Sequence, residues 1–162
     1  YGVTVTSVPD TRRENALLVS GAIDDRLPLG DLRVHEAAEH LLTAGGKRLR
    51  PALLIVVADA FGRSPRETVP PALAVEITHS FTLIHDDVMD DDPLRRGEES
   101  VHAKWDVPTA ILTGDYLYSK AFETAMETSA SDETMRRVME TLAETCQHVS
   151  YTHMMLRTKR IG

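Results

Sequence analysis

Apolar residues recur at steps of three and four along most of this chain, and polar residues fill the positions between them. This spacing is typical of amphipathic helices. No stretch of four to eight residues alternates cleanly like a strand with turn signals at both ends. Helices are predicted from Asp10, from Asp31 to Gly45, from Pro51 to Phe61, over 72–91, from Val107 to about Thr128, and after Asp132. The pattern therefore predicts an all-α fold, an antiparallel helical array.

Some of these helices carry more specific predictions about their ends and surroundings. Asp31 is suited to cap the second helix with its side chain. The run from Ala52 to Phe61 is apolar nearly all round, so that helix is predicted to be buried. Pro93 is expected to end the helix over 72–91, and residues 98–106 are expected to form a loop.

Length and composition indicate one folded domain. The 162 residues are enough for a sizeable core, and an apolar content of 42% excludes disorder as the default state. Residues 1–9 are predicted to form a flexible N-terminal arm, and residues 10–162 a helical domain. The net charge of −7 argues against a nucleic-acid partner.

Three features indicate where the protein works. No segment reaches the roughly 18 unbroken apolar residues of a membrane span, so an integral membrane protein is not expected. The N-terminus lacks an apolar signal core. The lone Cys146 fits a reducing compartment. A cytoplasmic location is therefore predicted.

The most unusual stretch is a group of five aspartates within the seven positions 86–92, which follows an apolar helical run. Carboxylates packed so densely repel one another unless a cation lies among them. Asp86 and Asp90 are four residues apart and share a helix face, an arrangement that suits Mg²⁺ with phosphate oxygens. A calcium loop is excluded because its alternating oxygen ligands and central glycine are missing. The remaining alternative is a solvated acidic helix end.

Basic residues lie on both sides of this stretch. Arg95 and Arg96 follow it, and a guanidinium matches phosphate oxygens in a bidentate way, so a diphosphate clamp is favoured over a surface pair. Upstream, Gly46-Lys47-Arg48 lacks the distal glycine and the Ser or Thr of a nucleotide phosphate loop. What remains is a glycine turn that presents Lys47 and Arg50 near a helix N-terminus, either to an anion or to solvent.

Two motifs in this order resemble those of the trans-isoprenyl diphosphate synthases, the polyprenyl synthetase family. Residues 45–51 read GGKRLRP, and residues 86–90 match DDxxD and are followed by LRRG at 94–97. The resemblance covers roughly residues 10–146 and implies a partial isoprenoid synthase fold. A class I terpene cyclase shares the aspartate motif, but the basic cluster for a second diphosphate speaks against it.

The resemblance implies two diphosphate sites and a catalytic set. For the diphosphate of isopentenyl diphosphate it implies the ligands Lys47, Arg50, His79 and Arg96. For the allylic diphosphate it implies Mg²⁺ on Asp86 and Asp90, with Arg95 on the same diphosphate, Asp87 as the middle member of the motif and Asp92 as a possible outer ligand. Magnesium and Arg95 would stabilise the departing diphosphate, and the alkene of isopentenyl diphosphate would attack the allylic cation. Without the resemblance, a histidine on a mostly apolar helix such as His79 is more typical of an ordinary core residue.

The resemblance also implies which product is formed and which part of a synthase this chain matches. An aromatic residue, Phe81, five positions before Asp86, with the small Thr82 next to it, resembles geranylgeranyl diphosphate synthases of the archaeal type. Family members carry a second aspartate motif, which this sequence lacks. We therefore expect the chain to match the N-terminal half of a synthase and to be weak or inactive alone. It would act as a homodimer or with another synthase chain, and the alternative is a non-catalytic subunit or pseudoenzyme that binds a partner synthase.

Overall fold

The structure is a computed structural model that describes residues 8–26 and 29–158. Most of the predicted N-terminal arm, residues 1–7, lies outside the described residues. Helix α1 begins at Val8, two residues before the predicted start at Asp10. Pro9 therefore lies in the first turn of this helix, where the missing N–H of a proline costs no hydrogen bond.

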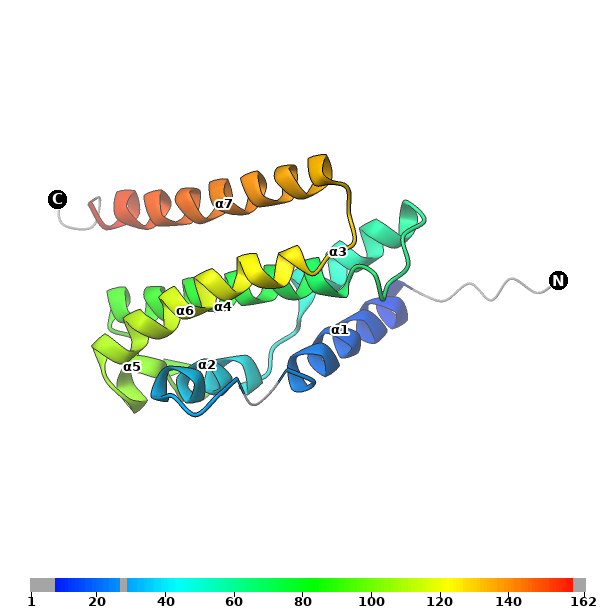
Figure 1. Cartoon of the computed structure of the whole chain (residues 1–162). Coiled ribbons are helices and arrows are strands. Elements are labelled where there is room, and N and C mark those ends of the chain that lie inside the picture. The colour runs from blue at the N-terminus through cyan, green and yellow to red at the C-terminus, as the bar shows by residue number, and fades with distance from the viewer. Residues whose placement is uncertain (1–7, 27–28, 159–162) are drawn as a thin grey trace. The chain divides into compact units, whose positions relative to one another are not determined.

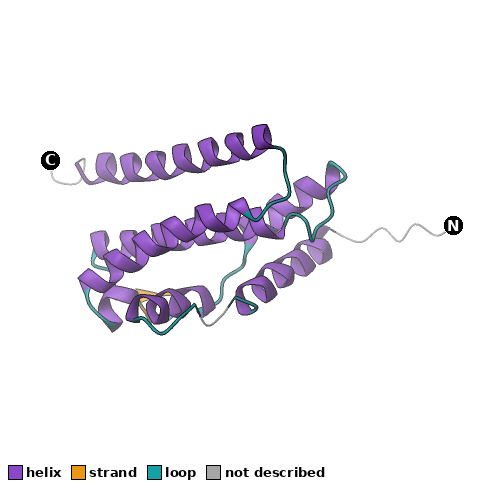
Figure 2. Cartoon of the chain, in the orientation of Figure 1, coloured by secondary structure: helices purple, strands orange, loops and turns teal. Residues whose placement is uncertain are grey.

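The described residues form seven helices and one short hairpin, as Figures 1 and 2 show. The elements are α1 (Val8–Asp24), α2 (Arg33–Thr43), α3 (Leu49–Ala60), α4 (Val69–Asp90), β1 (Leu94–Arg95), β2 (Glu98–Glu99), α5 (Val101–Lys104), α6 (Val107–Met126) and α7 (Asp132–Thr158). The predicted all-α class, an antiparallel helical array, is confirmed. None of the described helices has the length and apolar character needed to cross a membrane.

The chain divides into two compact units, Tyr1–Thr128 and Ser129–Gly162. The second unit contains α7, whose exposed surface carries an ion pair between Arg136 and Glu140. These two residues are one helical turn apart, a spacing that stabilises helices slightly. All the predicted site residues belong to the first unit.

Helices α4 and α6 form the centre of the first unit and pack along most of their lengths. The buried side chains of α4 include the large Leu73, Ile77 and Ile84, whereas α6 contributes mostly small residues such as Ala110. Small residues on one helix let the two backbones approach closely. Around this pair, α1 packs on α3 and α4, α2 packs on α6, and α3 packs on α4.

Helices α4 and α6 pack tightly at Gly114, where a Cβ atom would collide with the ring of His85. The same ring donates a hydrogen bond from Nε2 to the carbonyl of Ile111 at 3.3 Å. We expect Gly114→Ala to lower the free energy of unfolding by about 1–3 kcal/mol, because overpacking forces neighbouring side chains out of place. Urea unfolding measures this change.

The matched control is Gly21→Ala, at an exposed position in α1 where a Cβ atom meets nothing within 4 Å. There the added methyl group removes chain entropy from the unfolded state, so stability should rise by about 0.5–1 kcal/mol. Equal effects of the two substitutions would contradict the close packing of His85 against Gly114.

Three predictions about helix ends and surroundings were wrong. Asp31 does not cap α2, whose N-cap is Leu32 without a side-chain cap bond. Helix α4 ends at Asp90, three residues before Pro93, because Asp91 adopts a left-handed conformation with φ of 56°. Residues 98–106 are not simply a loop, since they contain β2, α5 and Asp106, whose carboxylate caps α6 by accepting a bond from the Thr109 N–H at 2.7 Å.

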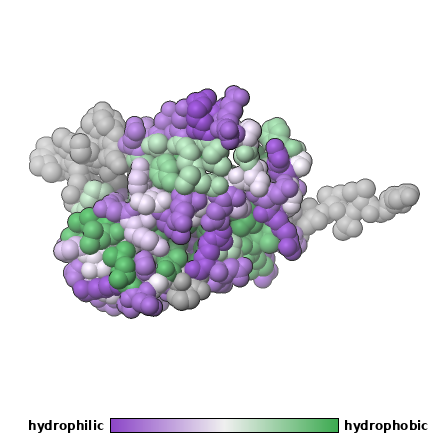
Figure 3. Space-filling model, in the orientation of Figure 1, coloured by the Kyte–Doolittle hydropathy of each residue, from purple (hydrophilic) through white to green (hydrophobic). Residues whose placement is uncertain are grey.

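Helix α3 is also less buried than predicted. It packs mainly on α1 and α4 through Pro51, Ala52 and Ile55. Leu53 and Val57 lie one turn apart on an exposed face, and Phe61 just beyond the helix is 84% exposed. Figure 3 likewise shows hydrophobic residues reaching one face of the molecule in patches between hydrophilic ones.

Candidate functional site

The predicted site residues lie along α4 and on the two segments that flank it, the turn between α2 and α3 and the β1–β2 hairpin. The hairpin pairs Leu94 with Glu99 and Arg95 with Glu98. Its two-residue loop, Arg96-Gly97, has φ angles of 56° and 87°, which is the pattern of a tight hairpin turn with two left-handed residues. Because neighbouring residues of such a hairpin project differently, Arg95 and Arg96 make different contacts despite being adjacent in sequence.

Arg95 contacts the aspartate group. Its Nε donates to Asp87 Oδ1 at 2.8 Å, and its Nη2 donates to the same oxygen. The Asp87 side chain is only 3% exposed, so this carboxylate is directed inward. The hydrogen bond and the charge of Asp87 raise the pKa of Arg95 despite partial burial, with a further contribution from Asp92, 3.7 Å away. In this structure Asp87 therefore holds Arg95.

Asp86 and Asp90 occupy the last turn of α4, with Asp86 half-buried and Asp90 exposed. Within residues 8–26 and 29–158, no three His, Cys, Asp or Glu side chains are close enough to form a metal site by themselves. Magnesium is commonly bound by only one or two carboxylates together with substrate phosphate oxygens. Two carboxylates one turn apart at a helix end fit such a site.

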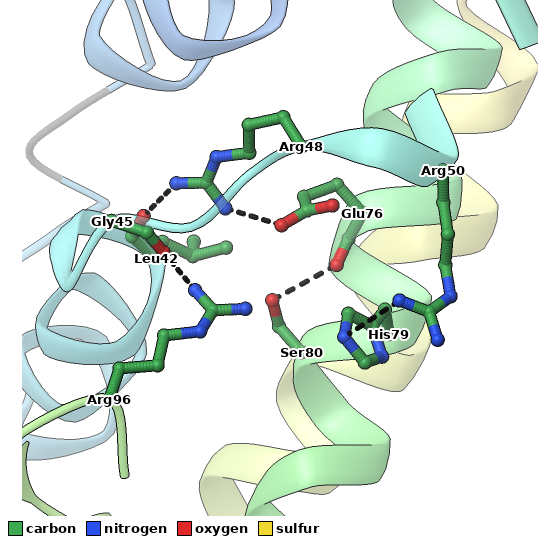
Figure 4. Close-up of polar contacts among 8 residues, drawn as sticks. All are labelled: Leu42, Gly45, Arg48, Arg50, Glu76, His79, Ser80 and Arg96. Carbon is green, nitrogen blue, oxygen red and sulfur yellow. Dashed lines mark hydrogen bonds and ion pairs between the residues drawn. The ribbon is translucent and has the colours of Figure 1, made fainter. Parts of the chain in front are cut away.

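A second group of residues gathers at the α2–α3 turn. Arg96 donates a hydrogen bond to the carbonyl of Gly45. A Cβ atom at Gly46, where φ is 142°, would lie 2.9 Å from Arg96 Nη1, so the glycine makes room for the guanidinium. Arg50 donates from Nη1 to His79 Nε2 at 3.2 Å, and Lys47 is exposed on the same turn. The structure thus brings Arg50 to His79 and Arg96 to the glycine turn (Figure 4).

His79 accepts this hydrogen bond from Arg50 because its ring is neutral. Burial lowers the pKa of His79, the charges of Arg50, Arg96 and Arg95 lower it further, and Glu76 raises it. A neutral Nε2 has the lone pair that an arginine N–H requires. The proton of the ring is then on Nδ1, which leaves His79 one donor of its own.

This lowered pKa predicts a pH dependence of stability. Above about pH 6.5 His79 is neutral in both states and contributes nothing. As the pH falls below that value, the unfolded chain takes up a proton that the folded chain resists, so the free energy of unfolding falls. Urea unfolding at pH 7.5 and 5.5 should show a smaller loss for His79→Gln than for the parent chain, and equal losses would contradict a neutral His79.

The residues predicted to limit product length lie two and three positions after His79. Phe81 is 7% exposed and packs edge-on against Tyr118 of α6, with ring centroids 5.4 Å apart. The hydroxyl of Thr82 donates to the carbonyl of His79 at 2.8 Å. Phe81 therefore faces the α4–α6 interface rather than the carboxylates of Asp86 and Asp90.

The sequence interpretation missed two interactions that support these groups. Arg48 forms a buried ion pair with Glu76 of α4 and donates to the carbonyl of Leu42 at 2.5 Å. His40 of α2 donates from Nε2 to the carbonyl of Glu99 at 2.8 Å and so ties the hairpin to α2. The isolated glutamate in the apolar run before the aspartates was the only sequence signal for the ion pair, because a buried carboxylate requires a cation.

The chain is similar to synthases of known families over most of its length. The Polyprenyl synthetase family model matches residues 32–155. A geranylgeranyl diphosphate synthase of Methanosarcina mazei is 47% identical over 132 residues, which are 81% of this chain and 41% of that protein. A geranylfarnesyl diphosphate synthase of Natronomonas pharaonis is 41% identical and is matched over 47% of its length.

Solved structures give the same result. The geranylgeranyl pyrophosphate synthetase of Geoglobus acetivorans superposes with a TM-score of 0.83 at 40% identity, over 88% of this chain and 47% of that one. The chain thus spans less than half the length of these relatives. With the family model covering most of its residues, the chain belongs to the polyprenyl synthetase family.

Proposed function

We propose that the chain provides one wall of the active site of an isoprenyl diphosphate synthase, which joins isopentenyl diphosphate to an allylic diphosphate. The observation that carries this proposal is the presence of two different groups along α4. Arg50 and Arg96 gather near His79, whereas Asp86 and Asp90 lie with Arg95 at the C-terminal end of the helix. A condensation of two diphosphates needs two such polyanion sites side by side.

The cationic group would bind the diphosphate of isopentenyl diphosphate. Lys47, Arg50 and Arg96 supply positive charge, and the arginine side chains can each donate two parallel bonds to phosphate oxygens. His79 would add a hydrogen bond from Nδ1 while its Nε2 orients Arg50. Burial lowers the pKa of Arg96, as do the charges of Arg48, Arg95 and Arg50, and a bound anion would relieve this repulsion.

The aspartates at the end of α4, with Arg95, would hold the allylic substrate. Asp86 and Asp90 would bind Mg²⁺, which when present neutralises charge on a diphosphate leaving group. Arg95 would bind the same diphosphate and stabilise its negative charge as the allylic carbon departs. We assign Asp87 to orienting Arg95, because its buried carboxylate already accepts both hydrogen bonds from that side chain.

The product is proposed to be geranylgeranyl diphosphate. Phe81 is a large buried residue five positions before Asp86, and it limits the space available to a growing chain between α4 and α6, with Thr82 beside it. The relatives from Methanosarcina mazei and Geoglobus acetivorans are named for this product, which supports the assignment.

Titration of the purified chain with inorganic diphosphate, with and without Mg²⁺, tests the two sites. Arg50→Met should weaken binding in both conditions at least tenfold, whereas Asp86→Asn should remove only the enhancement by Mg²⁺. Incubation with Mg²⁺, isopentenyl diphosphate and radiolabelled farnesyl diphosphate then tests turnover, which we expect to be weak for this chain alone. A parent chain that binds no diphosphate in either condition would overturn the proposal.

A second candidate is a non-catalytic subunit that binds a partner synthase. It is favoured by the exposed apolar residues of α3, among them Leu53 and Val57. Turnover that appears only on adding a longer homologue, and that survives Asp86→Asn in this chain, would support the subunit. Turnover by the chain alone that is lost with Asp86→Asn would support catalysis.

A further inference from the structure

The buried ion pair between Arg48 and Glu76 lies beneath the cationic group and has no place in the proposed chemistry. The two side chains are only 5% and 3% exposed, so neither can contact a substrate in this arrangement. Arg48 also donates to the carbonyl of Leu42 near the C-terminal end of α2. One guanidinium thus connects the α2 end to the middle of α4, as Figure 4 shows.

The backbone of Arg48 has an unfavourable conformation that its inward side-chain contacts hold in place. Its φ of 45° is left-handed, a conformation that costs a non-glycine residue about 1–2 kcal/mol. Its neighbours Lys47 and Arg50 are exposed, although all three residues are cations within four positions. An unfavourable backbone conformation persists only where surrounding contacts hold it, and the contacts here are Glu76 and Leu42.

Glu76 stands next to the residues that the pair would position. It is one helical turn before His79, and its carbonyl accepts the hydroxyl of buried Ser80 at 2.9 Å. His79 in turn receives the hydrogen bond of Arg50, which belongs to the same turn as Arg48. Figure 4 shows the guanidinium groups of Arg48 and Arg96 on opposite sides of the Leu42 and Gly45 carbonyls to which they donate.

We propose that the Arg48–Glu76 ion pair is a positioning device for the anion site, which holds the α2–α3 turn and the start of α3 against α4 so that Arg50 meets His79 and Arg96 meets Gly45. Neither residue touches the anion. The identity of the anion as a diphosphate rests on the function proposed above, whereas the positioning of Arg50 can be tested without any ligand.

The test uses the double variant Arg48→Met/Glu76→Met. It removes both charges together and keeps side chains of similar volume, a replacement that proteins often tolerate. The net charge around the anion site is unchanged, so a loss of binding cannot come from weaker electrostatic attraction. The control is Arg26→Met/Glu127→Met, an ion pair in the same unit with side chains 30% and 43% exposed. Circular dichroism checks that both variants are folded.

The first readout is the pKa of His79, measured by NMR titration of its ring protons. If the pair positions Arg50, the double variant releases this guanidinium from the ring and the pKa rises toward 6.5. If the pair acted only through charge, the loss of Glu76 would lower the pKa further, because Glu76 raises it in the parent. An unchanged or lower pKa in the folded double variant overturns the proposal.

Glu76→Gln provides a second variant that keeps an oxygen acceptor for Arg48. We expect its His79 pKa to stay below 6.5, since the turn remains in place while the negative charge is gone. A rise toward 6.5 in this variant as large as in the double variant could not come from the lost charge, which acts in the opposite direction. It would show that Arg50 leaves His79 although Arg48 keeps an oxygen partner, and it would overturn the proposal.

The second readout is calorimetric binding of inorganic diphosphate. The double variant should bind at least tenfold more weakly than the parent, and the Arg26→Met/Glu127→Met control should bind like the parent. Unchanged affinity in the double variant overturns the positioning role. A parent chain that binds no diphosphate contradicts the proposed function instead, and the NMR titration still decides whether the ion pair positions Arg50.

Discussion

Replacing Arg48 alone by methionine is expected to lower the free energy of unfolding by about 3–5 kcal/mol, because it leaves a buried carboxylate without its cation. Glu76 is 3% exposed, so water cannot take the place of the lost guanidinium without the helices moving apart. The substitution also removes the donor to the Leu42 carbonyl. A loss of this size is a large share of the stability of a small domain.

Urea unfolding of the two single variants and the double variant measures this effect. The double variant Arg48→Met/Glu76→Met should be more stable than Arg48→Met, because no unpaired charge remains in it. Arg26 gives the comparison, since its side chain is 30% exposed and loss of its pair with Glu127 should change stability by at most about 1 kcal/mol. Equal losses for Arg48→Met and Arg26→Met would contradict the importance of the buried pair.

Much of the fold followed from the sequence because helix periodicity is a local property. The long helices were predicted within a few residues of their observed ends, and Gly45-Gly46 correctly marked the break after α2. The β1–β2 hairpin was missed because strands of two residues are too short to show any alternation. Its one signal, a glycine after two arginines, was read as chemistry and not as a turn.

The candidate site shows where local patterns stop being informative. Lys47, Arg48 and Arg50 look alike in the sequence, yet only Arg48 turns inward, toward Glu76. A local pattern cannot show this, because Glu76 is 28 positions away. In the same way, Asp86 and Asp87 are adjacent but have different surroundings, since α4 points Asp87 toward the hairpin and Arg95. The family motifs name which residues to examine, and tertiary contacts decide which of them face a ligand.

Replacing Asp87 by alanine is expected to lower the free energy of unfolding by about 1.5–3 kcal/mol, the usual range for a hydrogen bond to a charged group. Its side chain is almost fully buried and accepts two bonds from Arg95. The substitution should also weaken diphosphate binding, because a released Arg95 can turn toward the exposed Asp92, 3.7 Å from it. Binding of inorganic diphosphate with Mg²⁺ should then weaken as it does in Arg95→Met.

A double-mutant cycle separates this role from general damage to the helix. The coupling energy between Asp87→Ala and Arg95→Met should be about 2 kcal/mol, because each single variant already loses the same interaction. The matched cycle with Asp92→Ala should give less than about 1 kcal/mol, since Asp92 is exposed and makes only a longer contact with Arg95. A coupling for Asp87 no larger than that for Asp92 would mean that Asp87 does not hold Arg95, and its burial would then need a different explanation.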